Sequence, residues 1–241
     1  YVGAGVAGSA IGMDKAVMRK ILAYHNIPQV GFTTVLRSLV ESDVSEAVKR
    51  VEAALAYPVF VKPANGGSSV GISKAHDAAE LVESLKLAAK YDRKILVEQG
   101  VNVREIEISV LGNEQPMVSV PGEIVASNEF YDYKAKYIDN KSVSVIPADI
   151  PADITAKIQA LAVETYQALE CEGFSRVDFF IDRDNGNIYL NEVNTLPGFT
   201  EISMYPKMWE AAGLAYDKLL AKLIELAEER FADRAKNSID C

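Results

Sequence analysis

One predicted β-hairpin constrains this chain more than any other stretch. Two runs of alternating apolar residues flank a turn that contains an Asn-Gly dipeptide, a pattern typical of hairpins. A loop at 184–186 places Asp178 opposite Glu192 and Arg176 opposite Asn194. Because successive side chains of a strand point to opposite faces, these four polar groups are predicted to share one face of the hairpin.

That polar face suggests a ligand site. Burying Asp, Glu, Asn and Arg side chains together is costly unless a ligand compensates them. Asp178, Glu192 and Asn194 offer only oxygen ligands, and such ligands suit Mg²⁺ or Mn²⁺. A solvated face of an edge hairpin is the alternative that the spacing leaves open. The loop 195–200 that follows can direct backbone N–H groups at an anion, and this favours the ligand site.

Composition narrows the class of protein. The 241 residues suffice for one large domain or two small ones, and the net charge of −9 argues against a nucleic-acid or anionic-membrane partner. Cys171 and Cys241 form neither a zinc motif nor a disulfide framework, which fits a reducing compartment. No membrane-spanning run or signal peptide is visible, so we expect a cytoplasmic protein. The chain opens at Tyr1 without a Met, and we expect a fragment of a longer protein.

The remaining pattern predicts a mixed α/β chain. A Gly- and Ala-rich loop is expected at 1–12, and a polar, frayed tail from 232 onward. The predicted helices cover 15–24, 45–56, 77–91, 151–169, 204–212 and 216–231, and the predicted strands cover 30–36, 57–63, 94–101, 104–111 and both arms of the hairpin.

Two lysines and a glycine-rich segment are candidates for phosphate binding. Lys62 ends an apolar strand, and lysines are seldom buried without a charged partner. Lys15 lies in the first turn of a helix, where the helix dipole does not favour a cation. The segment 64–71 is rich in Gly and Ser and could close over phosphates, although it matches neither the P-loop nor the dinucleotide-binding fingerprint. An exposed lysine and a plain hairpin turn are the alternatives.

Two further observations concern loops and histidines. The polar and aromatic segment 130–137 is interpreted as a functional loop or lid, with tyrosines packed on the core as the alternative.

His25 and His76 lie far in sequence from every candidate site and are expected at the surface, so histidine-based acid–base chemistry is not expected.

Six motifs in one order resemble those of the ATP-grasp enzymes, and of the D-alanine–D-alanine ligase family in particular. Each motif alone is weak, but the ordered set is specific and spans nearly the whole chain. The family's N-terminal domain looks absent. The motifs are Gly12–Lys15, Val61–Pro63, Gly67–Gly71, Phe130–Tyr137, Arg176–Asp178 and Asn191–Phe199.

The resemblance implies an ATP-grasp fold, in which two subdomains with mainly antiparallel sheets grip ATP between them. The implied parts are a linker at 1–12, a central subdomain at 13–98, a C-terminal subdomain at 99–235 with a lid loop at 128–141 and a metal hairpin at 175–195, and a frayed tail at 236–241.

The resemblance also implies roles for individual residues. Lys15 and Lys62 would hold the α- and β-phosphates, and Lys136 would approach the γ-phosphate from the lid. Residues 98–101 would frame the adenine and Glu105 the ribose. The implied ATP-binding set is Lys15, Lys62, Ser69, Glu98, Gln99, Gly100, Val101, Glu105 and Lys136.

The implied metal and catalytic residues lie mainly near the hairpin. Asp178, Glu192 and Asn194 would bind two Mg²⁺, with Mn²⁺ as the substitute. Arg176 and the N–H of Gly198 would stabilise a tetrahedral oxyanion. Ser203 would bind the carboxylate of the second D-alanine, and Ser68 and Tyr137 would link the glycine loop to the lid over the substrates.

The implied activity joins two D-alanines in two steps. The carboxylate of one D-alanine takes the γ-phosphoryl group of ATP, and the amine of the second displaces phosphate from the acyl phosphate to give the dipeptide of bacterial cell-wall precursors. Three alternatives stay open: a D-lactate acceptor, which the retained Tyr137 disfavours; another ATP-grasp carboxylate–amine ligase; and a nucleotide-binding fragment without turnover. The implied partners are small molecules, D-alanine and ATP, and a homodimer is left open.

Overall fold

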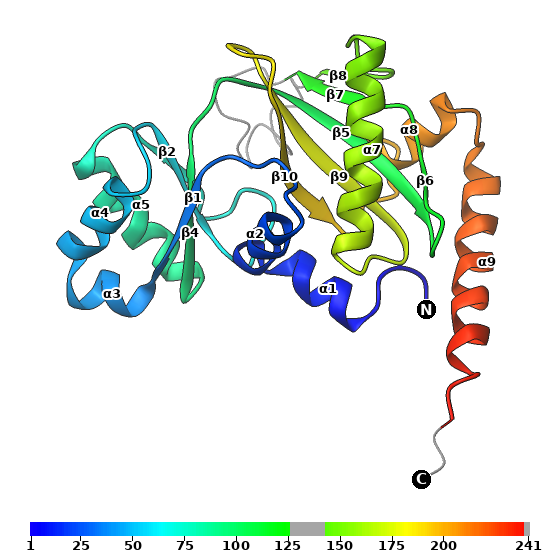
Figure 1. Ribbon diagram of the computed structural model, residues 1–241, viewed down its shortest axis with the longest axis horizontal. Coiled ribbons are helices and arrows are strands. Elements are labelled where there is room, and N and C mark those ends of the chain that lie inside the picture. The colour runs from blue at the N-terminus through cyan, green and yellow to red at the C-terminus, as the bar shows by residue number, and fades with distance from the viewer. Residues whose placement is uncertain (126–142, 239–241) are drawn as a thin grey trace.

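Two antiparallel β-sheets form the framework of the computed structural model (Figure 1). The structure describes residues 1–125 and 143–238. The expected lid loop 128–141, with Lys136 and Tyr137, lies outside the described residues, so its role stays a prediction.

The smaller sheet has a core on one face and functional side chains on the other. Helices α3 (Arg37–Ser42), α4 (Val44–Glu52) and α5 (Ala78–Tyr91) supply that core. In β2, Val59 and Val61 are buried in it, and strand alternation therefore turns Phe60 and Lys62 the other way. Its four strands, in order across the sheet, are β1 (Phe32–Leu36), β4 (Lys94–Gln99), β2 (Val59–Pro63) and β3 (Ser73–Ala75).

The larger sheet is arranged in the same way. Val177 and Phe179 of β9 pack into a core formed with α7 (Ala152–Ala168) and α2 (Lys15–Tyr24). Arg176 and Asp178, at the alternate positions, face away from that core. The sheet consists of β10 (Ile188–Asn194), β9 (Gly173–Asp182), β5 (Val103–Gly112), β7 (Gly122–Val125) and β8 (Val143–Val145), in this order, with β6 (Met117–Val118) paired to β5.

Helix α2 packs with the larger sheet. Its residues Met18 and Leu22 are fully buried in the same cluster as Val177. Helix α2, at the start of the implied central subdomain at 13–98, therefore shares its core with strands that come after residue 99, and the bounds of that subdomain stay a prediction.

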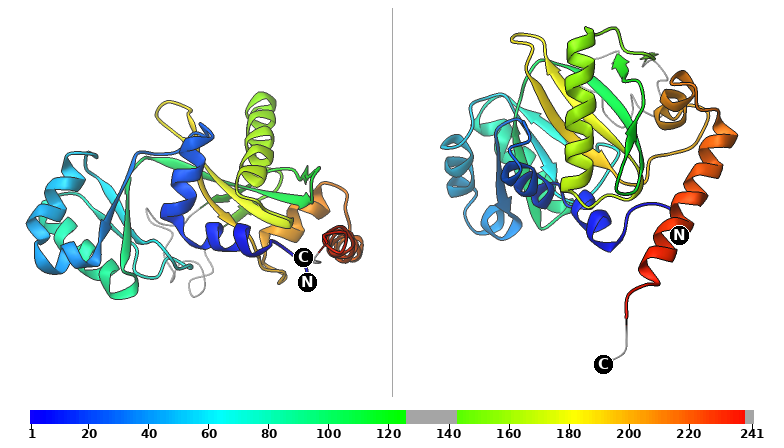
Figure 2. Two further views of the ribbon diagram at one scale, coloured as in Figure 1. Left: turned by 60° about the horizontal axis from the view of Figure 1, so that its bottom comes forward. Right: turned by 45° about the vertical axis from the view of Figure 1, so that its right-hand side comes forward.

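A third cluster joins the end of the chain to the larger sheet. Helices α8 (Met204–Ala211) and α9 (Tyr216–Arg234) pack around Phe174, and Figure 2 shows α9 lying beside the N-terminal segment. Arg230 of α9 is buried and donates hydrogen bonds to the carbonyl oxygens of Gly3 and Tyr1. The prediction of a frayed tail from 232 was wrong for its first residues, since α9 continues to Arg234.

The loop expected at 1–12 is also corrected, because residues Val6–Met13 form helix α1. Its small residues permit close packing. A Cβ built on the buried Gly8 would lie 2.4 Å from the carbonyl oxygen of Glu170. Gly and Ala are frequent in loops, whereas here they let a helix approach a neighbouring backbone closely.

The predicted pairs of the hairpin are confirmed, but the turn is one residue longer than expected. The Asp182 N–H donates to the Asn187 carbonyl, so four residues lie between them. A register shift of one residue between Leu190 and Glu192 then offsets the longer turn. As a result Glu192 pairs with Asp178, and Asn194 with Arg176, as the shorter loop also predicted.

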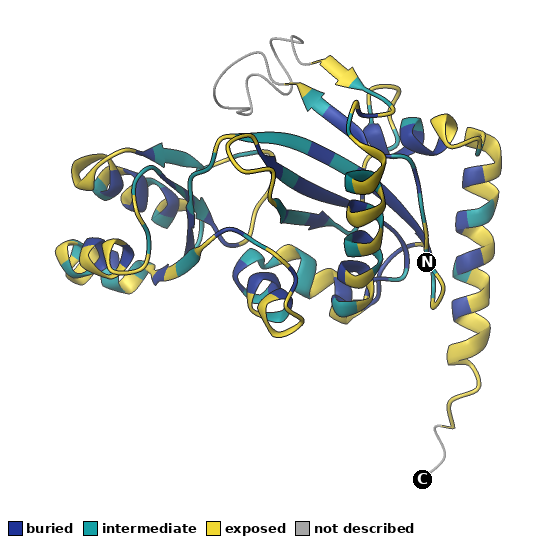
Figure 3. Cartoon of the chain, turned by 45° about the horizontal axis from the view of Figure 1, so that its top comes forward, coloured by how far each residue is buried: buried dark blue, intermediate teal, exposed yellow. Residues whose placement is uncertain are grey.

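The burial of residues follows this arrangement of sheets and helices. Figure 3 shows the strands of the larger sheet mostly buried, whereas the helices are exposed on their outer faces. No helix in the described part of the chain is long and apolar enough to cross a membrane.

We expect Gly8→Ala to destabilise the protein. Alanine favours a helix over glycine by up to about 1 kcal/mol, but the added methyl group meets a backbone oxygen that cannot move aside freely. Overpacking of this kind commonly costs about 1–3 kcal/mol, so the net change is a loss of stability measurable by urea unfolding. Gly67→Ala is the matched control, because a Cβ there meets nothing within 4 Å. Equal stability of Gly8→Ala and wild type would contradict the close approach.

Candidate active site

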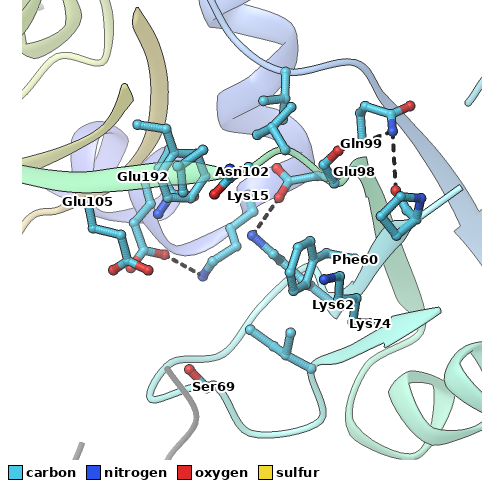
Figure 4. Close-up of a pocket in the computed structure, with 18 of the residues that line it drawn as sticks. Lys15, Phe60, Lys62, Ser69, Lys74, Glu98, Gln99, Asn102, Glu105 and Glu192 are labelled. Carbon is cyan, nitrogen blue, oxygen red and sulfur yellow. Dashed lines mark hydrogen bonds and ion pairs between the residues drawn. The ribbon is translucent and has the colours of Figure 1, made fainter. Parts of the chain in front are cut away.

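A cavity of about 710 Å³ is lined by strands of both sheets and by the glycine-rich segment. Figure 4 shows Lys15, Lys62 and Glu192 pointing into the region where Glu98 and Glu105 also lie. The cavity thus brings together residues more than a hundred positions apart in the sequence. Of the predicted site residues, it is lined by Lys15, Lys62, Ser68, Ser69, Glu98, Gln99, Gly100, Val101, Glu105 and Glu192.

Other predicted residues lie outside the lining. Arg176, Asp178 and Asn194 continue the polar face of the hairpin from Glu192, while Gly198 and Ser203 lie on the loop after it. The described part of the structure therefore contains one cavity with most of the predicted ATP-binding residues, and an adjacent acidic face with the predicted metal ligands.

Lys62 is held by a buried ion network. Its Nζ lies 2.5 Å from Oε2 of Glu98, and the other carboxylate oxygen, Oε1, accepts a hydrogen bond of 2.8 Å from Nε of Arg19. Arg19 is 1% exposed and also donates to the Leu190 carbonyl at 2.7 Å. The network therefore connects β2, β4, α2 and β10, and so joins the smaller sheet to the larger one.

This network fixes the charge state of the Glu98 side chain. Burial alone would raise the pKa of Glu98, but the charges of Arg19 and Lys62 outweigh burial and lower the pKa to about 2. Because two cations engage the Glu98 carboxylate, its oxygens are not available to an adenine ring. Any contact from Glu98 to adenine would have to come from its backbone.

Sequence reasoning missed Arg19. The helical period could have indicated it, because Arg19 stands three residues from both Ala16 and Leu22, which are buried. Its partner Glu98 lies 79 residues away, and no local pattern identifies it.

Lys15 reaches the glycine-rich segment from the start of α2. The Asp14 side chain accepts hydrogen bonds from the N–H groups of Ala16 and Val17, which fixes the beginning of the helix. Lys15 Nζ then donates to the Gly66 carbonyl at 2.9 Å and lies 3.4 Å from Oε2 of Glu192. The first turn of α2 thus places a cation between the glycine-rich segment and the hairpin.

The acidic face of the larger sheet is organised by Arg176. Its Nε and Nη2 donate to the two oxygens of Asp178, each at 2.7 Å, and Nε lies 3.2 Å from Oε2 of Glu107. Burial by itself would lower the pKa of Arg176, but the charges of Asp178 and Glu107 raise it above its ordinary value. Arg176 is therefore a fixed cation. Glu107 was not predicted, although its alternation with Glu105 on β5 places both on this face.

The donor set fits a hard divalent cation, although no metal centre is formed as the side chains stand. In the described residues no group of three or more His, Cys, Asp or Glu could hold a metal. Asp178 is engaged by Arg176, Glu192 approaches Lys15, and Asn194 Oδ1 accepts from the Leu196 N–H at 3.1 Å. Two carboxylates and an amide oxygen on one face nevertheless offer the oxygen ligands that Mg²⁺ and Mn²⁺ prefer.

Gly198 and Ser203 lie close to each other. A Cβ on Gly198 would lie 2.9 Å from Oγ of Ser203, so glycine permits this approach. Ser203 Oγ accepts from the Thr200 N–H at 3.0 Å, and Ser203 immediately precedes α8. His25 and His76 are exposed and do not line the cavity, as expected.

Two antiparallel sheets that hold a lysine-lined cavity between them, beneath a glycine-rich segment, define the architecture of the ATP-grasp proteins. The model of the D-ala D-ala ligase C-terminus matches residues 21–225. The chain therefore belongs to the D-alanine–D-alanine ligase family.

Individual relatives agree with this assignment. The chain is 51% identical to the D-alanine–D-alanine ligase of Acetivibrio thermocellus over 98% of its own length and 63% of that protein. It is 52% identical to the D-alanine–D-alanine ligase of Heliobacterium modesticaldum over 100% and 66% of the two lengths. The chain thus spans somewhat less than two thirds of the length of these relatives.

Solved structures resemble the fold over nearly the whole chain. The D-alanine–D-alanine ligase from Coxiella burnetii superposes with a TM-score of 0.83 at 37% identity, covering 98% of this chain and 62% of the other. The VanG D-Ala:D-Ser ligase from Enterococcus faecalis gives 0.84 at 40% identity, with coverages of 93% and 64%. The expected α/β ATP-grasp fold is confirmed.

We expect Glu98→Gln to destabilise the protein in a pH-dependent manner. The pKa of Glu98 falls from 4.5 to about 2 on folding, so its ionisation stabilises the native state above about pH 4.5 and the effect is lost towards pH 2. Such a shift corresponds to about 3 kcal/mol, and the variant also leaves Arg19 and Lys62 facing each other. Urea unfolding from pH 7 to about pH 3 should show a gap between wild type and variant that narrows with falling pH.

The control for this prediction is Glu83→Gln. Glu83 is 74% exposed and pairs with Lys86 at the surface, so its loss should change stability little at any pH. A gap for Glu98→Gln that stayed constant down to about pH 3 would contradict the ionised network.

Proposed function

We propose that this chain provides the ATP-binding and catalytic parts of an ATP-dependent ligase that joins two D-alanines. The observation that carries the proposal is the convergence of Lys15, Lys62 and Glu192 on one cavity, in a chain of this family. The two cations suit the phosphates of ATP, and the carboxylate suits a cation shared with them. The product would be the D-alanyl-D-alanine of bacterial cell-wall precursors.

The residues of the cavity bind and orient the nucleotide. Lys62 is fixed by Glu98 and Lys15 by the Gly66 carbonyl, so both would meet the α- and β-phosphates without first being ordered. The glycine-rich segment, with Ser69, would cover the phosphates, while backbone groups of 98–101 and the carboxylate of Glu105 would meet adenine and ribose. Closure over the site would exclude water, which would otherwise hydrolyse an acyl phosphate.

The acidic face would hold the divalent cations. Asp178, Glu192 and Asn194 are the ligands we propose for two Mg²⁺, with Mn²⁺ as the substitute. When bound, these ions would offset the negative charge that accumulates during phosphoryl transfer. Asp178 would have to leave Arg176, and Glu192 would have to leave Lys15, before either could serve as a ligand.

The remaining residues would act on the amino acids. The Arg176 guanidinium and the N–H of Gly198 would stabilise the oxyanion formed when the amine attacks the acyl phosphate. Ser203, at the start of α8, would bind the carboxylate of the second D-alanine, where the helix dipole favours an anion. Ser68, with Tyr137 and Lys136 of the lid, would complete the enclosure of the substrates.

The acceptor is the least constrained part of the proposal. One structural relative is named as a D-Ala:D-Ser ligase, so members of this fold family differ in the second substrate. Tyr137 remains the proposed selector of D-alanine over D-lactate. A homodimer likewise remains a proposal.

The test of the function is an assay of the complete enzyme. We expect release of ADP and formation of D-alanyl-D-alanine with ATP, Mg²⁺ and D-alanine, and little product with D-serine or D-lactate at neutral pH. Calorimetry should show ATP binding to this chain with Mg²⁺ and much weaker binding in EDTA. Equal affinity in EDTA would contradict a shared site for metal and phosphate. A dominant D-serine or D-lactate product would change the acceptor but not the class of reaction.

We expect Glu192→Gln to abolish metal-dependent turnover while the protein still folds. The change removes one charge but nearly preserves shape, and Glu192 is partly exposed, so the melting temperature without ligand should stay close to wild type. The rise in melting temperature with Mg²⁺·ATP should shrink, because that rise follows the affinity of the native state for the ligand. Activity should fall roughly a hundredfold or more.

Glu225→Gln provides the comparison for Glu192→Gln. Glu225 pairs with Lys222 on the exposed face of α9, and its loss should leave both the ligand response and turnover unchanged. Normal turnover of Glu192→Gln would refute its assignment as a metal ligand, and a variant that fails to fold would make Glu192 a structural residue.

A further inference from the structure

Glu107 lies beside the proposed catalytic residues but has no role in the reaction as described so far. It stands on β5, directly opposite Asp178 on the neighbouring strand β9. Its side chain is 13% exposed, and its Oε2 lies 3.2 Å from Nε of Arg176. Among the described residues, Arg176 therefore forms ion pairs with one carboxylate on its own strand and one on β5, while the charge of Glu192 acts on it from farther away.

Glu192 and Glu107 lie on different sides of Asp178. The strand order β10-β9-β5 places Asp178 between Glu192 on β10 and Glu107 on β5. Asp178 and Glu192 are the carboxylates proposed as metal ligands. Glu107 is on the opposite side of Asp178, where its neighbour is the guanidinium of Arg176.

Binding of a cation by Asp178 changes the surroundings of Arg176. Both oxygens of Asp178 now accept hydrogen bonds of 2.7 Å from the guanidinium. A carboxylate in this bidentate arrangement cannot give the same lone pairs to a metal ion, and a metal ion would also repel the guanidinium. Arg176 must then lose much of its contact with Asp178, and a largely buried guanidinium requires another anion close by.

We propose that Glu107 is a positioning residue that holds Arg176 in the site when Asp178 turns to bind the divalent cation. The proposal rests on the proposed function, because it takes Asp178 as a metal ligand and Arg176 as the group that stabilises the oxyanion. The guanidinium has five N–H donors in a rigid plane, so it can exchange one carboxylate for the other with a small movement. Glu107 thereby keeps Arg176 charged and in place for the second step.

The test is Glu107→Gln in the complete enzyme. We expect kcat to fall tenfold or more, while the KM for ATP stays within about twofold, because the nucleotide contacts are untouched. Mn²⁺ affinity in the presence of a non-hydrolysable ATP analogue, measured by electron paramagnetic resonance, should also stay within about twofold of wild type. Without ligands the melting temperature should stay near wild type, because Asp178 still engages Arg176.

Two further variants complete the design. Glu107→Asp keeps the charge on a shorter side chain and should recover part of the lost kcat. Glu123→Gln is the matched control, because Glu123 forms a similar bidentate pair with Arg104 on the same sheet, away from the proposed ligands. It should leave kcat and Mn²⁺ affinity unchanged, whatever it does to stability.

The other outcomes are distinct. A tenfold loss of Mn²⁺ affinity in Glu107→Gln would make Glu107 a metal ligand and overturn the positioning role. An equal loss of melting temperature with and without ligands, at unchanged kcat, would make it a structural residue only. An unchanged kcat with unchanged stability would remove it from the mechanism. Failure of the proposed function would appear already in the wild type, which would form no dipeptide, and that result would overturn both proposals.

Discussion

The buried ion pair between Glu98 and Arg19 is the interaction that connects the two halves of the structure. Glu98 belongs to the smaller sheet, whereas Arg19 stands on a helix packed against the larger one, so their buried ion pair joins the two cores. Lys62 shares the same carboxylate. Two cations on one anion leave one positive charge of this network uncompensated by Glu98, beside the cavity. Such a surplus suits an anionic ligand, and the same network therefore contributes both to cohesion and to the electrostatics of the site.

Strand alternation explains why the polar groups gather on the cavity side. In both sheets one face carries the apolar residues that pack against helices, and every second residue turns away from them. Lys62, Glu105, Glu107 and Asp178 occupy such alternate positions, so burial of one face delivers the functional groups to the other. The fold thus positions the site through the same period of two that builds its cores.

The same local periodicity determines which features of the fold and of the candidate site can be predicted from the sequence. The hairpin pairs, the helix from Lys15 to Tyr24 and the position of Lys62 on a strand follow from local patterns, and the structure agrees with them. Helix α1 was missed because small residues signal close packing as well as loops. Arg19 and Glu107 were missed for another reason: their roles depend on partners 79 and 69 residues away, and pairing at such distances comes from tertiary packing. The proposed roles of Gly198 and Ser203 rest on the family resemblance, because no local rule assigns them.

The compensated register of the hairpin has a consequence for how such chains can diverge. Leu190 pairs with Phe179 and Glu192 with Asp178, the next residue along β9, so Asn191 is an extra residue of β10 with no residue of β9 opposite it. A chain that lacked Asn191 would keep the pair of Glu192 with Asp178, because Glu192 would then follow Leu190 directly. A one-residue change within a regularly paired part of β10 would instead reverse the side chains on one side of it. The bulge is therefore the position at which this strand can change in length without moving Glu192 from the face of Asp178.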